Sequence, residues 1–458
     1  MSLRHTIKTS LHSILSAKLS GAIGLVSIFY GINIVLGLGR DMILSATFGA
    51  TKQLDAFLLG MSFVRVNGLL ISAAIANALI PVFVDIITKK KYEIALAFIM
   101  RGLRDLSIAL VILAVTVIGL ATPLAKLLGP GLDANGQSIL THTLQGLAPL
   151  FLILGLSGLT KTVADSTGRY ISHPVLLLSM TAGLIGCVAF FHKSLGIRSA
   201  IIGMVGGALT GLLAQLFVIA WKRNNLISQY LQQIWEHKST IWHIPGSSLP
   251  YYSILILLVS SFVTQAQGII ERRYVSYLPA GTMVSLSLAL SVLTIPTVLL
   301  LPAVSSVLLP YFVRQEQNQI QSRFGLSIFQ YGILLGIFLM FTALYWLGGS
   351  FIIDILFYRG AFSKNAVDLT ANILRLLSIS FAPYILAMVF RQVLLANRML
   401  IADLGVITIV LFSKLVFLQL TVPYYGIYGI IFTIILGAFL SALFYFLIIQ
   451  YGQSKSFS

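Results

Sequence analysis

Long apolar runs separated by short polar connections recur along the whole chain. A helix needs about 20 apolar residues to cross the hydrocarbon core of a bilayer. Only helices and closed barrels satisfy the backbone there, and these runs are too long and continuous for barrel strands. The pattern predicts an all-α integral membrane protein with about twelve transmembrane helices, at 20–39, 56–85, 103–127, 139–162, 173–192, 197–221, 248–270, 280–311, 325–347, 367–390, 401–421 and 425–449.

The composition agrees with this class and excludes others. Of the 458 residues, 58% are hydrophobic and 9% are charged, whereas soluble domains carry roughly 25% charged residues. The net charge of +17 would suit a nucleic-acid-binding protein only if a basic domain carried it, and here the basic residues are dispersed among apolar runs. Cys187 is the only cysteine, so no intrachain disulfide is expected. The first apolar run lacks the features of a cleaved signal peptide and is expected to remain as a span.

The basic residues also predict the topology. Of the 30 Lys and Arg, 18 lie at the two ends and in the even-numbered connections, 9 in the odd-numbered connections and 3 inside spans. Because cytoplasmic loops carry the excess of Lys and Arg, both termini are expected in the cytoplasm. The longest polar connection has apolar residues at helical spacing and predicts an amphipathic surface helix. The expected segments are an N-terminal segment 1–19, a first lobe 20–221, a cytoplasmic linker 222–247, a second lobe 248–450 and a cytoplasmic tail 451–458.

An internal repeat relates the two halves. Several short motifs of the first half recur in the second half in the same order, at an offset that stays between 229 and 232 residues. A parallel repeat of this kind predicts two six-helix lobes related by a pseudo-two-fold axis along the membrane normal, with a substrate path between them. The matching segments are 79–84 with 308–313, 40–41 with 271–273, 128–131 with 357–360, and Ala164 with Ala396.

Charged residues inside the spans are the main candidates for function. An ionisable side chain at membrane depth is costly, so it normally faces a cavity or pathway. Arginine binds phosphate oxygens in bidentate geometry, and a mainly cationic lining therefore suits an anionic ligand such as one that carries phosphate. The candidate residues for binding such a ligand are Arg40, Arg65, Arg272, Arg273, Arg375 and Lys414.

Three acids near the span ends are candidates for ion coupling or for structural pairing: Asp41, Asp55 and Glu271. The structural alternative is that Arg40 pairs with Asp41 or Asp55, and Arg272 with Glu271. The sequence leaves both interpretations open.

Other chemistry has little support. The chain contains no phosphate-cradling Gly-x-x-x-x-Gly-Lys-Ser/Thr motif, so energy is expected from an ion gradient, the membrane potential or consumption of the product. The histidines are scattered without metal spacing. A membrane glycosyltransferase or ligase would need a large outer loop with catalytic residues, and the longest outer connection, 348–365, offers only Asp354. We therefore expect a secondary transporter rather than an enzyme, without a metal or cofactor beyond a coupling ion such as H⁺ or Na⁺.

Several motifs resemble those of one family of flippases. In order they read Leu36-Gly37-Leu38-Gly39-Arg40-Asp41, Phe48-Gly49-Ala50, Asp55-Ala56-Phe57, Ile80-Pro81-Val82-Phe83, Leu309-Pro310 and Arg359-Gly360-Ala361-Phe362. They resemble the MurJ/MviN lipid II flippases of the multidrug/oligosaccharidyl-lipid/polysaccharide exporter superfamily. The resemblance implies two lobes around a V-shaped cavity and alternating access that moves an undecaprenyl-diphosphate-linked cell-wall precursor to the outer leaflet. Arg40, Asp41 and Asp55 match family positions.

The chain departs from the family pattern in four places. Ile34 and Ser291 stand where the family usually has arginines, and a mostly neutral run over 67–77 replaces its charged cluster. The family often has fourteen spans, and twelve are predicted here. These departures indicate a divergent member and leave two alternatives open. One is a flippase for another polyprenyl-linked glycan, such as a capsule, exopolysaccharide or O-antigen unit, and the other is a cation-coupled drug antiporter of the same superfamily.

The resemblance also implies surroundings for the protein. It places the chain in the bacterial cytoplasmic (inner) membrane and connects it with peptidoglycan synthesis, cell-wall biogenesis and cell shape. The expected partners are the lipid-linked glycan, membrane lipid and enzymes of cell-wall or polysaccharide synthesis, and no nucleic acid is expected.

Overall fold

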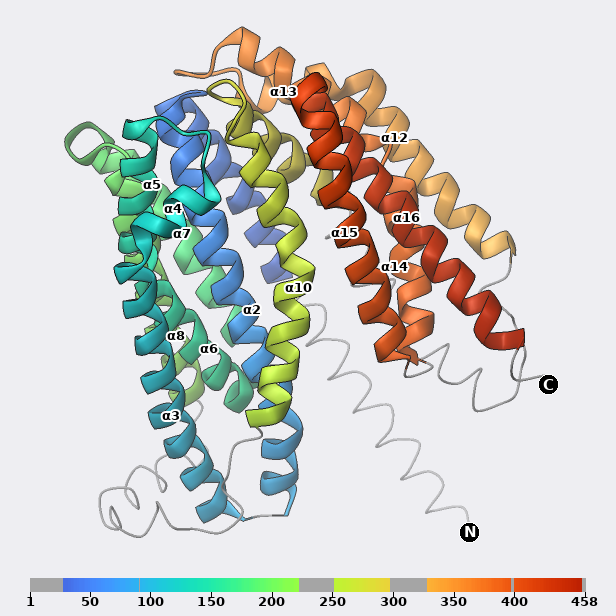
Figure 1. Ribbon diagram of the computed structural model, residues 1–458. Helices are drawn as coiled ribbons and strands as arrows, with labels where there is room; N and C mark the ends of the chain where they lie inside the picture. Colours follow the sequence, from blue (N-terminus) through green and yellow to red (C-terminus); the bar gives the residue numbers. More distant parts are fainter. Residues whose placement is uncertain (1–27, 90, 222–250, 297–327, 397–398, 455–458) are drawn as a thin grey trace. The chain divides into compact units, whose positions relative to one another are not determined.

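The computed structural model is helical throughout the part of the chain that it describes, residues 28–89, 91–221, 251–296, 328–396 and 399–454 (Figure 1). A first helix covers Ile28–Phe48, and a shorter apolar helix covers Thr282–Pro296. The other helices are α2 (Lys52–Thr88), α3 (Tyr92–Gly119), α4 (Ala121–Leu128), α5 (Ala134–Leu147), α6 (Pro149–Ser166), α7 (Ser172–Leu195), α8 (Arg198–Trp221), α10 (Tyr251–Val275), α12 (Ile328–Phe357), α13 (Lys364–Ser378), α14 (Phe381–Ala396), α15 (Leu400–Tyr425) and α16 (Ile427–Ser454).

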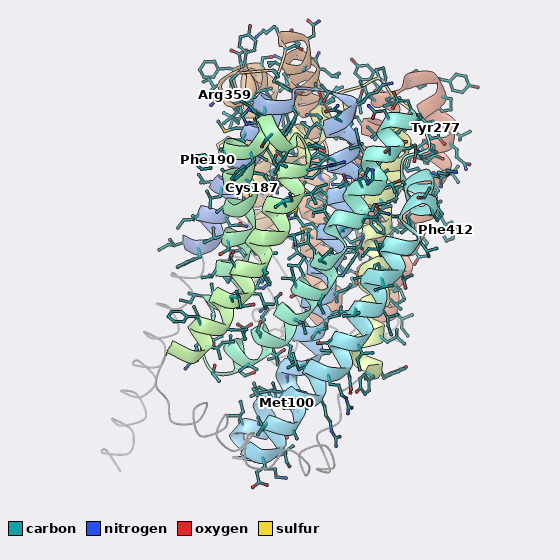
Figure 2. The ribbon with its side chains drawn as sticks, turned by 90° about the vertical axis from the view of Figure 1, so that its left-hand side faces the viewer. Met100, Cys187, Phe190, Tyr277, Arg359 and Phe412 are labelled. Carbon is teal, nitrogen blue, oxygen red and sulfur yellow. The ribbon has the colours of Figure 1, made fainter. Side chains whose placement is uncertain are left out.

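The helices confirm the predicted all-α membrane class. Among the described residues, nine helices are long and apolar enough to cross a membrane, or ten if the bent pair α13–α14 is one span. Large apolar side chains face outward, for example Phe190 on α7 and Phe412 on α15, which are 83% and 63% exposed (Figure 2). Such side chains suit contact with lipid. The count of twelve stays a prediction, because residues 297–311 of the expected eighth span lie outside the described residues.

The described helices form two compact units that do not coincide with the sequence halves. The first contains 64–120 and 144–258 together with the chain up to residue 40, and the second contains 41–63, 121–143 and 259–458. Segments of the first half therefore pack with second-half helices inside the second unit. The lobes expected from the sequence, 20–221 and 248–450, stay a prediction. The expected segment 1–19 and linker 222–247, the motif around Pro310 and the last residues of the tail lie outside the described residues.

In the first unit, α7 and α8 pack closely because glycines line their contact. A Cβ atom added at Gly207 would lie 2.5 Å from the Ser179 carbonyl oxygen, and one at Gly211 would lie 2.9 Å from Leu176 Cα. Small residues let helix backbones approach within a membrane, where dispersion contacts replace the hydrophobic effect as the attraction between helices. Gly207 and Gly211 therefore have a packing role in the contact between α7 and α8.

In the second unit, α13 and α14 form a span that is bent by 46° at the break between them. Ser363 caps the start of α13 by accepting a hydrogen bond from the Ala366 amide. Pro383 lies in the first turn of α14, where its missing N–H needs no helical partner, but its ring disfavours continuation of a helix from the preceding residues. The proline thus accounts for the break.

The structure supports the internal repeat at an offset of 230 residues. The α7–α8 connection turns at Gly196, with φ 55°, and the α15–α16 connection turns at Gly426, with φ 53°. Each glycine amide donates to a carbonyl four residues earlier, His192 and Val422 respectively. Glycine tolerates this left-handed conformation at a helix C-terminus. Helices α6, α7 and α8 thus correspond to α14, α15 and α16.

Candidate functional site

Within the second unit, segments from the two sequence halves meet through a pair of related hydrogen bonds. The Ala361 amide donates to the Ala46 carbonyl oxygen at 2.7 Å. The Gly131 amide donates to the Ser276 hydroxyl at 3.2 Å. Ala46 and Ser276 are 230 residues apart, as are Gly131 and Ala361. The repeat therefore brings corresponding segments together twice, with a backbone carbonyl as acceptor in one contact and a side-chain hydroxyl in the other. We call the region around these four residues the seam.

Glycines allow the backbones of the seam to approach one another. Gly49, Gly281 and Gly360 adopt φ values of 64°, 85° and 59°. A Cβ atom at Gly49 would lie 2.7 Å from the Ala361 carbonyl oxygen, and one at Gly281 would lie 2.7 Å from Ala50 Cβ. A larger residue would be strained by the backbone conformation and would also collide with the facing segment.

Asp55 joins the halves with a charged contact at the same seam. Its carboxylate accepts hydrogen bonds from the Gly281 amide at 2.6 Å and the Val284 amide at 2.8 Å. These amides begin the helix Thr282–Pro296, so an acid of the first half caps a helix of the second half. The partial positive charge of a helix N-terminus favours a carboxylate there. Asp55 is buried, with 7% of its surface exposed.

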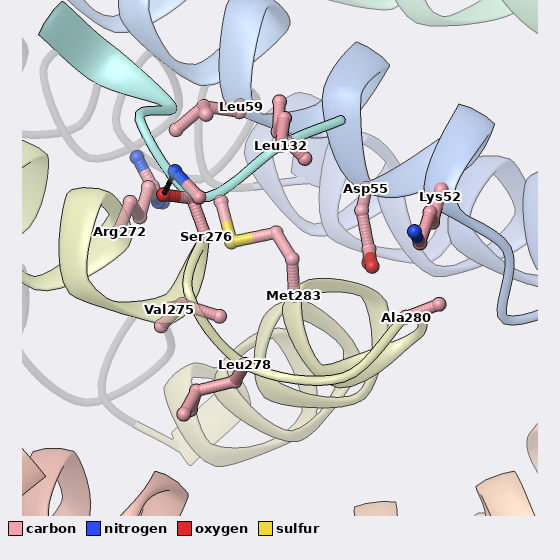
Figure 3. A pocket seen from close by; sticks show the side chains of 11 residues that line it. Lys52, Asp55, Leu59, Leu132, Arg272, Val275, Ser276, Leu278, Ala280 and Met283 are labelled. Atoms are coloured by element: carbon pink, nitrogen blue, oxygen red, sulfur yellow. Dashed lines mark hydrogen bonds between the residues drawn. The ribbon is translucent and has the colours of Figure 1, made fainter. Parts of the chain in front are cut away.

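A small pocket opens beside this cap (Figure 3). Its empty volume is about 380 Å³, and Asp55 and Arg272 both line it. In Figure 3 the pocket lies between α2, the segment at Leu132 and the end of α10, with the Ser276 hydrogen bond at its edge. Lys52 also lines the pocket and pairs with Asp133 at 3.0 Å.

The acid Glu271 pairs with a basic residue that is distant in sequence. Lys414 Nζ lies 2.7 Å from Glu271 Oε1, and the two side chains are 12% and 14% exposed. Gly437 on α16 provides the space for the lysine, because a Cβ atom there would overlap the end of the Lys414 side chain. The pair is neutral overall. Arg272, the residue next to Glu271, also interacts with it electrostatically, so the hydrogen bond from Lys414 does not exclude the expected pairing of Arg272 with Glu271.

The other predicted site residues lie in different places. Arg375 is half-buried in the last turn of α13, and its Nε atom has no hydrogen-bond partner in the described part of the chain. Arg273 is exposed on α10. Arg40 and Arg65 belong to the first unit and are half-buried. Asp41 is buried in the second unit, with 6% exposure. Their roles in diphosphate binding or ion coupling stay predictions.

Sequence reasoning missed a second buried network. Arg391 donates two hydrogen bonds to Asp403, both at 2.9 Å, and the Tyr445 hydroxyl donates to the same carboxylate at 2.7 Å. The sequence contained a partial indication of the Arg391–Asp403 pair, because the two residues lie close to one short connection between two apolar runs. Nothing in the sequence pointed to Tyr445.

A family model described as "Lipid II flippase MurJ" matches residues 44–457, which include all four residues that define the seam and extend through both halves of the chain. The chain belongs to the MurJ family of lipid II flippases. The resemblance inferred from the Leu-Gly-x-x-Arg-Asp, Phe-Gly-Ala and Asp-Ala-Phe motifs is confirmed. Membership also makes the chain a multi-pass membrane protein of a transporter family.

Individual proteins are similar to this chain in sequence or in fold. The chain is 24% identical over 379 residues to a "Probable lipid II flippase MurJ" from Buchnera aphidicola subsp. Baizongia pistaciae (strain Bp), a match covering 79% of this chain and 70% of the relative. It is similar in fold to a lipid II flippase MurJ in an inward closed conformation, with a TM-score of 0.75, 18% identity, and coverage of 93% and 87%. An inward-facing MATE family transporter of the MOP superfamily matches with a TM-score of 0.74, 15% identity, and coverage of 92% and 95%.

Proposed function

We propose that this MurJ-family protein moves a lipid-linked, diphosphate-bearing cell-wall precursor similar to lipid II to the outer leaflet by alternating access. The observation that carries the proposal is the family match, which extends through both halves of the chain from residue 44 to residue 457. Because a transporter of this kind needs both halves around its substrate path, a match confined to one half would not support transport.

The charges of the spans support an anionic substrate. Arg65 lies within the apolar helix α2, and Arg375 lies in the last turn of α13, inside the bent span α13–α14, where charged residues are costly. The described acid Glu271 is already neutralised by Lys414, and Asp55 is occupied with backbone amides. We propose that Arg40, Arg65, Arg272 and Arg375 bind the diphosphate through charge-assisted hydrogen bonds.

The contacts at the seam are suited to closing and opening one end of the protein during alternating access. Under the predicted topology, the connections that contain Gly49, Gly131, Ser276 and Gly360 face the outside. Contacts joining the sequence halves at these connections would close the outer end of the protein while the substrate enters from the cytoplasm. Opening that end would require these contacts to break.

We further propose the cellular setting. The protein would lie in the bacterial inner membrane with both termini in the cytoplasm, and would work beside enzymes of cell-wall or polysaccharide synthesis. Transport would use no organic cofactor. Moving one charge across 100 mV is worth about 2.3 kcal/mol, so the membrane potential or an H⁺ or Na⁺ gradient is sufficient to bias the conformational change.

Complementation tests the proposed function directly. The gene is expressed in a bacterial strain depleted of its own lipid II flippase, and membrane insertion is verified on the same cells. Growth with outward movement of lipid II is the expected result. Arg65→Gln and Arg375→Gln are expected to abolish rescue, while Lys193→Gln, at an exposed position on α7, is the matched control. An inserted wild-type chain that does not restore lipid II movement overturns the proposal.

A further inference from the structure

Arg272 lines the pocket at the seam, and its side chain makes no hydrogen bond within the described part of the chain. The half-buried guanidinium interacts electrostatically with the neighbouring Glu271 carboxylate, but that carboxylate takes its hydrogen bond from Lys414. A guanidinium has five N–H donors in a fixed planar arrangement. An arginine that lines a pocket with these donors available is suited to a ligand with acceptor oxygens.

The oxygen atoms that line the same pocket already accept hydrogen bonds from the protein. The two carboxylate oxygens of Asp55 accept from the Gly281 and Val284 amides. The Ser276 hydroxyl accepts from the Gly131 amide and donates to a backbone carbonyl of its own helix turn at 2.6 Å. The pocket therefore offers donors to a ligand, and this favours an anion over a cation.

The charged side chains lie on two sides of the pocket. In Figure 3 Arg272 lies on one side, and Asp55 and Lys52 lie on the other. Apolar side chains line the space between the two sides: Leu59, Val275, Leu278 and Met283. Apolar surroundings strengthen a pair of opposite charges, because the local dielectric constant is low. An anion on the Arg272 side would thus be held strongly and kept apart from the Asp55 carboxylate.

The size of the pocket limits what can enter it. Its empty volume of about 380 Å³ includes the space at its open edge, and sites for drug-sized molecules range from about 300 to 1,000 Å³. A pocket at the lower end of this range suits a single small group rather than a complete glycan headgroup. Lys52 is exposed where it lines the pocket and pairs with Asp133, so a ligand can enter from the water on that side.

A ligand in this pocket would contact both sequence halves within the second unit. The start of α2 and the segment at Leu132 come from the first half, whereas the end of α10 and the residues up to Met283 come from the second. The hydrogen bonds of Asp55 and Ser276 that join these segments border the pocket. A ligand that binds one state more tightly shifts the equilibrium toward that state. A ligand that bridges the two halves therefore favours the closed seam.

We propose that this pocket binds a phosphate group and that the bound phosphate stabilises the closed seam. Arg272 is the main partner, in bidentate geometry, and Lys52 attracts the anion at the exposed edge. Under the predicted topology the pocket lies toward the outside, where the phosphate belongs either to a free inorganic anion or to the headgroup of a lipid. The inference deepens the proposed function, which includes Arg272 among the phosphate-binding arginines, but binding to the pocket requires no transport.

Binding to the purified full-length protein in neutral detergent tests this site. The probes are inorganic phosphate, inorganic diphosphate and farnesyl diphosphate, with sodium chloride at equal ionic strength as the comparison. Calorimetry measures affinity, and hydrogen–deuterium exchange at the Gly281 and Ala361 amides reports the closed seam. A bound phosphate group is expected to slow exchange at both amides. Arg272→Gln is expected to weaken binding by about tenfold and to remove this protection. Lys126→Gln, at an exposed position on α4 outside the pocket, is the matched control.

The inorganic and lipid probes distinguish the sources of the phosphate. Binding of the inorganic probes that depends on Arg272 assigns the site to a free anion, and such binding of farnesyl diphosphate alone assigns it to a lipid headgroup. Arg272→Lys, which keeps the charge but loses the bidentate geometry, is the second variant if Arg272→Gln does not fold. The proposal is overturned if no phosphate probe binds more tightly than chloride, if the folded Arg272 variant binds as the wild type does, or if bound phosphate leaves both amides unprotected. Failure of complementation would not change these results, because no probe has to cross the membrane.

Discussion

The Asp55 carboxylate accepts a hydrogen bond of 2.6 Å from the backbone amide of Gly281, a residue 226 positions later in the chain. This contact connects the start of α2 with the start of the helix Thr282–Pro296. It belongs to a seam at which the repeat brings Ala46 to Ala361 and Gly131 to Ser276. The seam is where contacts between sequence halves must rearrange if the protein alternates between two states.

Removing the Asp55 carboxylate is expected to weaken the seam. Asp55→Ala leaves the amides of Gly281 and Val284 without their acceptor, and loss of a helix cap costs about 1–2 kcal/mol. The expected result is a lower unfolding temperature of the purified protein in detergent. Asp85→Asn is the control, because the side chain of Asp85 is 59% exposed in its pair with Lys89 and should contribute little. Equal effects of the two substitutions would contradict the capping role.

Variants of the ion pair between Glu271 and Lys414 can distinguish a structural role of Lys414 from a role in substrate binding. Lys414→Met leaves a buried carboxylate unpaired, which costs about 3–5 kcal/mol. The double variant Glu271→Gln with Lys414→Met should recover most of the lost stability, as measured by denaturant unfolding. If Lys414 also binds the diphosphate, the stable double variant should still lose transport. Normal transport by that variant would limit the pair to a structural role.

An exposed ion pair provides the comparison for the variants of Glu271 and Lys414. Lys364 Nζ lies 2.5 Å from Asp354 Oδ1, and the two side chains are 54% and 40% exposed. Because water screens such a pair, Lys364→Met is expected to cost less than about 1 kcal/mol. A cost as large as that of Lys414→Met would show that burial is not the cause of the difference.

The effect of a glycine-to-alanine substitution on stability should depend on the backbone conformation at that glycine. Gly360→Ala places a Cβ atom against the Ala46 backbone at a φ of 59°, and the strain and overlap should cost about 1–3 kcal/mol. Gly186→Ala lies within helix α7, where a Cβ atom meets nothing within 4 Å. It should be neutral or stabilising by up to about 1 kcal/mol. Thermal unfolding of both variants measures the contrast.

Asp133 makes part of the seam sensitive to acid. Hydrogen bonds from the Gly136 amide and from Lys52 lower the pKa of this carboxylate below its ordinary value. A lowered folded-state pKa means that Asp133 stabilises the fold above the unfolded value of about 4. The contribution is lost as the pH falls through the lower folded-state pKa. Hydrogen–deuterium exchange at the Gly136 amide should accelerate in that window, and Asp133→Asn should remove the pH dependence.

Much of the fold could be predicted because it depends on local composition. A run of about 20 apolar residues is stable across a bilayer whatever its neighbours are, so helices such as α7 and α8 were predicted within a few residues of their ends. The repeat was visible as well, and the Gly196 and Gly426 turns support it. Several short motifs in the same order, from the one around Arg40 to the one around Arg359, indicated the family that the family model confirms.

The hydrogen-bond partners of Glu271 and Asp55 were decided by tertiary structure alone. Glu271 stands beside Arg272 in the sequence, but it pairs with Lys414, 143 residues away. Asp55 was a candidate for an ion pair and instead caps a helix. Such pairings depend on the rotation of each helix about its axis and on the depth at which helix ends meet. Composition and periodicity determine that a helix crosses the membrane, whereas packing against its neighbours determines which of its side chains touch.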